Sequence, residues 1–178
     1  MRLSRTGLAL LAGLALPMTT AIAADSLPGG ANSLRETYDN WVLSCGVQKT
    51  GSAPLVVCSV SAEQVDANTK RRAVAVGINP VADGTAKGSI LMPFGLALSK
   101  GVTIQVDGGP ATSPIAYRTC TPGGCIVPLD WTADSVKVMR GGTTLKLAAT
   151  ADNGQPVDLA VPLKGFSAGF DRALELTK

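Results

Sequence analysis

The sequence predicts an all-β domain, a sandwich or a barrel, and two observations indicate this fold. Short runs of β-prone residues recur along the chain, and clusters of glycine, proline, asparagine and aspartate separate them. The second observation is that four cysteines follow an export signal, an even number that predicts two disulfide bonds. A small exported β domain stabilised by two disulfides is therefore expected, with a short helix at its C-terminus.

The expected strands are short and show apolar residues at alternate positions. In one run Val74, Val76 and Ile78 share one face, and the residues between them are small. The predicted strands cover residues 38–45, 55–62, 73–78, 102–106, 115–120, 125–129, 143–149 and 157–163.

Residues 132–140 have the signals of a short helix. Thr132 is suited to the N-cap and Gly141 to the C′ position, whereas Val136 and Val138 favour a strand, so both structures stay open.

Residues 167–176 predict a helix more clearly. Ser167 is suited to the N-cap, and Phe166, Phe170 and Leu174 recur every four residues with Ala173 beside them. This apolar stripe predicts that the C-terminal helix packs on the core.

The N-terminus has the three parts of a secretory signal peptide. Arg2 and Arg5 precede the apolar residues 8–16, and small residues then lead to an expected cleavage between Ala23 and Ala24. The apolar segment is shorter than the about 20 residues that a membrane span needs, so the mature chain is expected to have none. The expected organisation is a signal peptide at 1–23, a flexible leader at 24–36 and a single β-sandwich domain at 37–178, located in the periplasm or secreted.

Charge gives little information on partners once the signal is removed. The precursor has 16 basic and 13 acidic residues, and loss of Arg2 and Arg5 leaves a net charge near +1. The one basic cluster is Lys70, Arg71 and Arg72, which is our candidate for contact with an anionic partner. No aromatic residues alternate with these charges, so nucleic acid is not an expected partner.

The four cysteines allow three pairings. Cys120 and Cys125 enclose a Thr-Pro-Gly-Gly turn, and Cys45 and Cys58 belong to successive predicted strands, which favours the two local pairs. A four-thiolate zinc site is the alternative, but the wide spacing of Cys45 and Cys58 lacks the second close pair that such sites have.

The chain contains no histidine, which removes the commonest general base and the commonest metal ligand. Carboxylates such as Glu63 and Asp66 lie in a polar turn, where a solvated role is expected. We therefore expect no catalytic residues, no metal and no cofactor, although a serine–lysine pair stays open.

Several motifs occur in the order found in the invasion-associated locus B family, which the chain resembles over about residues 38–176. The motifs are Tyr38-Asp39-Asn40-Trp41 with Cys45, Cys58, Met92-Pro93-Phe94-Gly95, Gly101-Val102, Val106-Asp107-Gly108, Cys120, Gly124-Cys125 and Leu163-Lys164-Gly165-Phe166-Ser167. The resemblance implies an exported bacterial protein with an immunoglobulin-like β-sandwich, named from a locus linked to host-cell entry. The family has no established catalytic residues that could be transferred to this chain.

The leading hypothesis is a non-enzymatic envelope or secreted protein that acts through contacts with another protein, at the envelope or a host surface. Its candidate contact surfaces are the loop between Cys45 and Cys58 and the polar residues 63–72. One alternative is a periplasmic accessory or chaperone-like module that uses an exposed strand edge. The other alternative is an enzyme of unrecognised type.

Overall fold

Two antiparallel sheets pack around one core in the computed structural model, which describes residues 26–50, 53–81 and 83–178. The larger sheet has seven strands in the order β1-β2-β3-β4-β5-β8-β7, and the smaller has three in the order β10-β9-β6. The predicted signal peptide and its cleavage site at Ala23 and Ala24 lie outside the described residues.

The strands of the larger sheet are β1 (Ser33–Tyr38), β2 (Trp41–Thr50), β3 (Ala53–Val65), β4 (Arg72–Pro80), β5 (Ala86–Met92), β7 (Thr119–Thr121) and β8 (Gly124–Trp131). Those of the smaller sheet are β6 (Thr103–Val106), β9 (Thr144–Thr150) and β10 (Pro156–Pro162). The α-helices are α1 (Ala133–Gly141) and α2 (Phe166–Leu176), and short 3-10 turns lie at Pro28–Gly30 and Leu98–Lys100.

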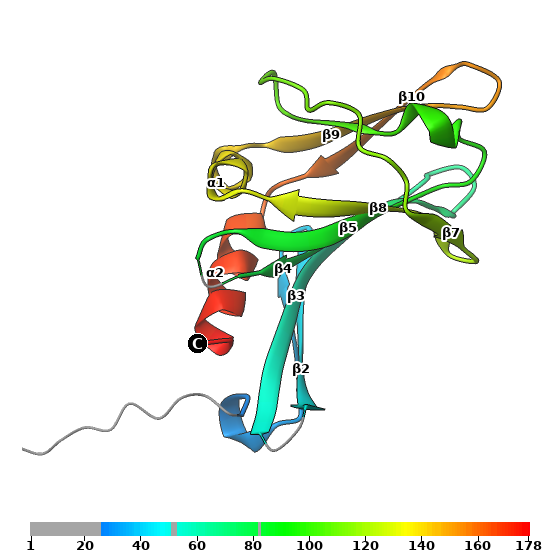
Figure 1. Ribbon diagram of the computed structural model, residues 1–178. Helices are drawn as coiled ribbons and strands as arrows, with labels where there is room; N and C mark the ends of the chain where they lie inside the picture. The colour runs from blue at the N-terminus through cyan, green and yellow to red at the C-terminus, as the bar shows by residue number, and fades with distance from the viewer. Residues whose placement is uncertain (1–25, 51–52, 82) are drawn as a thin grey trace, which may run out of the picture.

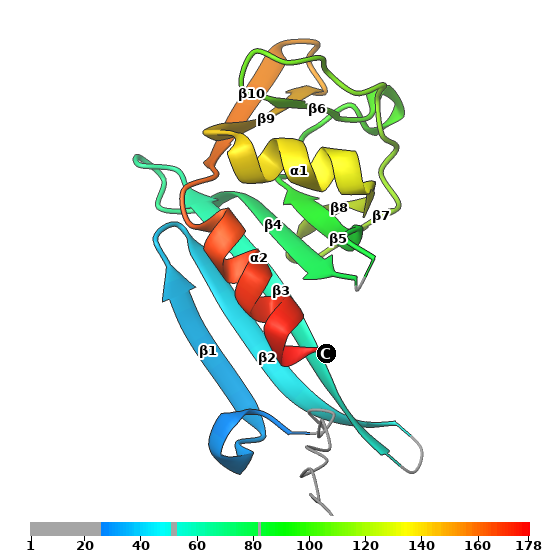
Figure 2. The same ribbon diagram turned by 90° about the vertical axis from the view of Figure 1, so that its left-hand side faces the viewer.

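The two halves of the large sheet have different covers on their inner face (Figures 1 and 2). The smaller sheet lies over the β5–β8 end, whereas α2 lies across β2 and β3 at the other end. The expected β-sandwich with a terminal helix and two disulfides is confirmed. The helix takes the place of further strands, because the three-stranded sheet is too narrow to cover a seven-stranded partner.

Trp41 lies where the two sheets and α2 meet, and its side chain is fully buried. Its indole Nε1 donates a hydrogen bond of 2.9 Å to the carbonyl oxygen of Pro162, the last residue of β10. Its ring centroid is 4.9 Å from that of Phe166, which is 5.4 Å from that of Phe170. One residue of β2 therefore contacts both the small sheet and the terminal helix.

A charged contact joins the two helices. Arg140 of α1 donates to both carboxylate oxygens of Asp171 in α2, at 2.6 and 2.7 Å, and its guanidinium lies 5.6 Å from the ring centroid of Phe170. Both contacts come from the single nitrogen Nη2, and they join α1 to α2.

The expected flexible leader is wrong for its second half. Residues 33–36 form part of β1, which pairs with β2 along its whole length, and Leu27 is buried with 1% exposure. The strand is missed in the sequence because it is mostly polar, and its pairing with β2 stabilises it. A two-residue turn at Asp39, which has a φ of 49°, also divides the predicted strand 38–45 into the ends of β1 and β2.

The strand β5 is a second element that the sequence analysis missed. It has Lys87, Gly88 and Ser89 in its centre, which interrupt any apolar alternation, yet it pairs with both β4 and β8. The predicted strand 115–120 is shorter than expected, because only residues 119–121 form β7 and Ile115 makes an isolated bridge to Val102.

The helix at residues 132–140 is confirmed as α1, with Thr132 as its N-cap. The Thr132 side chain accepts a hydrogen bond of 3.2 Å from the backbone N–H of Ser135. The expected C′ role of Gly141 is wrong, since Gly141 is the last helical residue and Gly142 follows it with a φ of −86°.

The C-terminal helix begins at Phe166, so the expected N-cap at Ser167 is wrong. The N-cap is Gly165, whose φ of 92° and close approach to the carbonyl oxygen of Tyr38 leave no room for a Cβ. The buried stripe ends on Leu176, which is 7% exposed, and Leu174 is only partly buried, because a helical period of 3.6 residues moves the stripe off Leu174.

Both disulfides join residues directly opposite each other on neighbouring strands. Cys45 on β2 pairs with Cys58 on β3 with a Cα–Cα distance of 4.1 Å, and Cys120 on β7 pairs with Cys125 on β8 at 3.9 Å. These are the two local pairs that the sequence favours, and the alternative zinc site is ruled out for cysteines bonded in this way.

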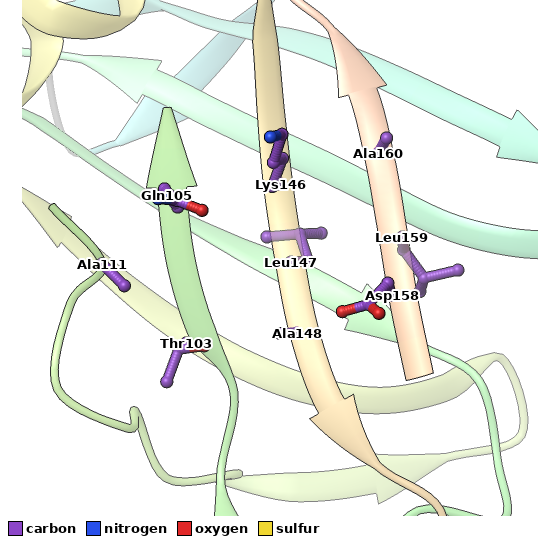
Figure 3. A pocket seen from close by; sticks show the side chains of 9 residues that line it. All are labelled: Thr103, Gln105, Ala111, Lys146, Leu147, Ala148, Asp158, Leu159 and Ala160. Carbon is purple, nitrogen blue, oxygen red and sulfur yellow. The ribbon is translucent and has the colours of Figure 1, made fainter. Parts of the chain in front are cut away.

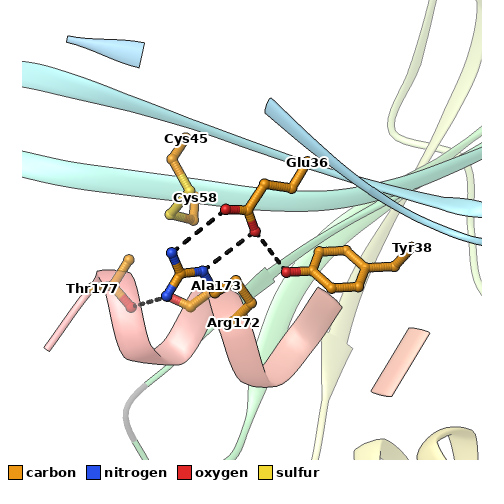
Figure 4. Close-up of a disulfide and its surroundings, with 7 residues drawn as sticks. All are labelled: Glu36, Tyr38, Cys45, Cys58, Arg172, Ala173 and Thr177. Carbon is orange, nitrogen blue, oxygen red and sulfur yellow. Dashed lines mark hydrogen bonds and ion pairs between the residues drawn. A yellow bond between two sulfur atoms is a disulfide. The ribbon is translucent and has the colours of Figure 1, made fainter. Parts of the chain in front are cut away.

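A small polar network lies beside the first disulfide (Figure 4). Tyr38 Oη donates to Glu36 Oε2 at 2.6 Å, and Arg172 of α2 lies 3.3 Å from the same oxygen. The tyrosine hydrogen bond, followed by the arginine, lowers the pKa of Glu36, and the same hydrogen bond raises the pKa of Tyr38. The network attaches β1 to α2.

Candidate functional site

The acidic side chains singled out in the sequence have structural roles. Asp66 Oδ1 accepts hydrogen bonds from the backbone N–H groups of Asn68 and Thr69, at 3.1 and 2.7 Å, and from the Thr69 hydroxyl at 2.9 Å. These bonds, that of the Thr69 backbone first, lower the pKa of Asp66. The carboxylate thus stabilises the turn between β3 and β4 in its charged form.

Among the residues that the structure describes, no group of three or more histidine, cysteine, aspartate or glutamate side chains is placed to hold a metal ion.

One hollow lies on the outer face of the small sheet (Figure 3). Side chains from β6, β9 and β10 line it, with Lys146 opposite Ala160 and Asp158 opposite Ala148 on the neighbouring strands β9 and β10. Its volume is about 280 Å³. The polar lining consists of one lysine, one carboxylate, one amide and the hydroxyl of Thr103. No described side chain that could act as a base makes a hydrogen bond to this hydroxyl, so the lining shows no arrangement typical of nucleophilic catalysis.

A larger groove, of about 580 Å³, lies at one end of the large sheet, and we call it the Phe94 groove. Four separate segments form it: the β3–β4 turn, the bend after β5, the β7–β8 turn and the middle of β10. Its lining residues are Asp66, Thr69, Arg71, Arg72, Ala73, Pro93, Phe94, Pro122, Gly123 and Leu159.

Phe94 is the exposed aromatic side chain of this groove. The chain has three phenylalanines, and Phe166 and Phe170 are fully buried whereas Phe94 is 57% exposed. Pro93 ends β5, and Gly95 has a φ of 85°, so the chain turns sharply on either side of Phe94 and presents its ring at the surface.

The three basic residues of the predicted cluster have different positions. Arg72 Nη2 donates to the carbonyl oxygen of Gly123 at 2.8 Å, and Nη1 lies 3.5 Å from Glu63 Oε2. Arg72 thereby attaches β4 to the second disulfide turn. Arg71 lines the groove and has no ion pair with any described residue, and Lys70, with a φ of 55°, belongs to the turn and does not line the groove.

The second surface expected from the sequence, the loop between Cys45 and Cys58, is mostly paired strand. The ladder of β2 and β3 continues past the disulfide to Thr50 and Ala53. Its exposed apolar residue, Leu55, lies at the opposite end of β3 from Arg72 and the Phe94 groove. The structure thus separates the two candidate surfaces by the length of β3.

Phe94 is the residue of this site that the sequence analysis missed, since the motif at residues 92–95 entered it only as part of the family resemblance. The signal was present in the local sequence. An aromatic residue between a proline and a glycine lies in a turn, and turns are found at the surface.

The fold and the groove together define a disulfide-bonded β-sandwich closed by a terminal helix, with an aromatic and basic groove at one end of its larger sheet. A family model described as "Invasion associated locus B (IalB) protein" matches residues 41–174, and the chain belongs to this family.

Relatives and a solved structure agree with this membership. The chain is 41% identical to an invasion protein B homologue of Brucella abortus over 92% of both chains. It is 33% identical to invasion protein B of Bartonella bacilliformis, over 91% of this chain and 86% of that protein. The crystal structure of invasion associated protein b from Bartonella henselae has a TM-score of 0.73 at 37% identity and covers 81% of this chain and 97% of its own.

None of the helices within the described ranges is both long enough and apolar enough to cross a membrane.

The different positions of Arg71 and Arg72 predict different effects on stability. Arg72→Gln should lower the free energy of unfolding by about 1 kcal/mol, because a charged hydrogen bond to Gly123 is lost from a side chain that is 35% exposed. Arg71→Gln should change it by less than about 0.5 kcal/mol. Urea denaturation of both variants measures the difference, and equal losses would contradict the structural role of Arg72.

Proposed function

We propose that this protein is exported and acts without catalysis, through contacts between its Phe94 groove and another protein at the envelope or a host surface. The relatives are named as invasion proteins, a description that concerns cell entry and no chemical reaction. The two disulfides favour an oxidising compartment outside the cytoplasm. Two motifs that lie apart in the sequence, the basic cluster and the motif at residues 92–95, both contribute side chains to this groove.

The observation that carries the proposal is the exposed ring of Phe94 beside Arg71. Aromatic residues and arginine are enriched at the centres of protein interfaces, where a few such side chains provide most of the binding energy. Only 4% of the residues are aromatic, and Phe94 is 57% exposed, so its ring offers an apolar surface whose burial by a partner would stabilise a complex.

The charges indicate the chemistry of the partner. Arg71 and the adjacent Lys70 make no ion pair with a described carboxylate, although Asp66 lines the same groove, whereas Arg72 is held by Glu63 and Gly123. A segment with an apolar side chain for Phe94 and acidic residues for Arg71 fits this groove.

A second candidate function is a periplasmic accessory module that binds an extended segment along β1, an edge strand of the large sheet. Val47 N–H donates to Asn32 C=O, and hydrogen-bonded pairs alternate along an antiparallel ladder. The outward backbone groups of β1 therefore belong to Ser33, Arg35 and Thr37, and they are available to a partner strand.

Site-specific photo-crosslinking distinguishes the two surfaces. A benzophenone amino acid at position 94 should capture the partner in living cells, whereas the same group in place of Thr37 or Leu55 should not. Crosslinking from Thr37 alone would favour the strand-edge function and contradict the groove.

Binding affinity provides the quantitative test. Phe94→Ala should lower the affinity for the captured partner by about tenfold or more, which equals about 1.4 kcal/mol of binding free energy. Arg71→Glu should lower the affinity most at low salt, because dissolved ions screen the attraction between exposed charges at high salt. The matched controls are Leu55→Ala, another exposed apolar residue, and Lys137→Glu on α1, both of which should bind as the wild type does. Loss of binding in the controls, or turnover of a substrate by the purified protein, would overturn the proposal.

Export has its own test. The intact mass of protein recovered from outside the cytoplasm should correspond to a chain that begins at Ala24. A recovered chain that keeps residues 8–16 would contradict cleavage.

A further inference from the structure

A second hollow lies on the outer face of the large sheet, the face away from α2, and it is independent of the Phe94 groove. Strands β3, β4, β5 and β8 form its floor, and its volume is about 330 Å³. We call it the serine hollow. Its lining residues are Ser59, Gly77, Asn79, Gly88, Ser89, Arg118, Ile126 and Pro128.

One of the two glycines that line the hollow makes its floor low. Gly88 lies opposite Ile78 and Leu129, whose side chains are buried in the core, and a Cβ at Gly88 would overlap the carbonyl oxygen of Gly77. Gly77 is different: the nearest atom to an added Cβ would be Ser59 Oγ at 3.9 Å, an ordinary contact distance. Strand pairing therefore does not need a glycine at position 77, and the missing side chain leaves space on the sheet.

The rim of the hollow provides polar groups that the described protein does not use. The side chains of Ser59, Asn79, Ser89 and Arg118 make no hydrogen bond or ion pair with any described residue. Neighbouring groups on the same face are paired: Ser61 Oγ donates to the carbonyl oxygen of Val42 at 3.4 Å, and Lys87 Nζ lies 3.7 Å from Asp130 Oδ1.

The remaining wall is apolar and consists of Ile126 and Pro128. The serine hollow thus combines one guanidinium, two hydroxyls, one amide and a small apolar wall. A single inorganic anion would use the guanidinium but would leave the apolar wall and much of the volume empty. A nucleobase would need a stacking partner, and no aromatic side chain lines the hollow.

We propose that the serine hollow binds one acidic sugar residue, a uronic or sialic acid, of a polysaccharide or glycan chain. Arg118 pairs with the sugar carboxylate, since a guanidinium binds a carboxylate with two parallel hydrogen bonds. Ser59, Ser89 and Asn79 bind ring hydroxyls, and the C–H face of the ring lies on Ile126 and Pro128. The lining is mostly polar with one small apolar wall, which suits a ligand that carries several hydroxyl groups and one C–H face.

Nuclear magnetic resonance titration of the mature protein tests this inference with four probes: sodium glucuronate, sodium N-acetylneuraminate, glucose and sodium sulfate. At least one acidic sugar should shift the backbone amide signals of Gly77, Gly88 and Ser89 at millimolar concentration. Glucose lacks the carboxylate and sulfate lacks the ring, so both should shift them at much higher concentration.

Variants separate the site from general effects on the sheet. Gly77→Ala should keep or raise the melting temperature, because alanine fits the strand conformation of this position. Its methyl group fills the floor of the hollow, so the affinity for the acidic sugar should fall by about tenfold or more. Arg118→Gln should weaken it similarly. The matched controls are Gly46→Ala, a strand glycine on the same face with no atom within 4 Å of an added Cβ, and Lys87→Gln, and both should bind normally.

Three results would overturn the inference: no shift with either acidic sugar, equal binding of sulfate, or unchanged binding in Arg118→Gln. If Gly77→Ala failed to fold, Arg118→Gln with its Lys87→Gln control would decide, because Arg118 is exposed and makes no side-chain contact that folding needs.

Discussion

The packing of the small sheet and of the terminal helix on the large sheet depends on Trp41, whose indole donates a hydrogen bond to the carbonyl oxygen of Pro162. Pro162 is the last residue of β10, an edge strand of the small sheet, and the Trp41 ring contacts Phe166 at the start of α2. One side chain of the large sheet thus fixes where the small sheet ends and where the helix begins. Gly165 completes this junction, because only a glycine fits against the Tyr38 carbonyl group.

The proposed contact surface depends on this frame without being part of it. The Phe94 groove contains residues from the β3–β4 turn and the start of β4, the bend after β5, the β7–β8 turn and β10, and its shape requires the two sheets to be fixed relative to each other. The second disulfide and Arg72 hold the Pro122–Gly123 wall in place, since the guanidinium binds Gly123 and the disulfide closes the same turn. Such a surface loses little conformational entropy on binding, which favours affinity.

Sequence patterns predicted the elements whose own residues alternate clearly or carry a cap, and missed those whose residues show no such pattern. The alternation of Val74, Val76 and Ile78 predicts β4, and the position of Thr132 predicts the start of α1. The strands β1 and β5 are polar or glycine-containing and exist because neighbours pair with them. The basic cluster was visible in the sequence as a run of charges. The hydrogen bond of Arg72 to Gly123, the position of Arg71 in the groove and the exposure of Phe94 became visible only in the structure, because they depend on segments far apart in the chain.

The most direct test of the Trp41 junction is amide hydrogen exchange in Trp41→Phe, which keeps a ring and removes the indole donor. Loss of a buried hydrogen bond costs about 1–3 kcal/mol when it leaves an acceptor unpaired. Exchange should therefore become faster in β10 and α2 and stay unchanged relative to wild type in β4 and β5. Trp131→Phe is the matched control, because the Trp131 indole N–H has no hydrogen-bond partner among the described residues. Uniform acceleration over both sheets, or equal effects of the two substitutions, would contradict the account.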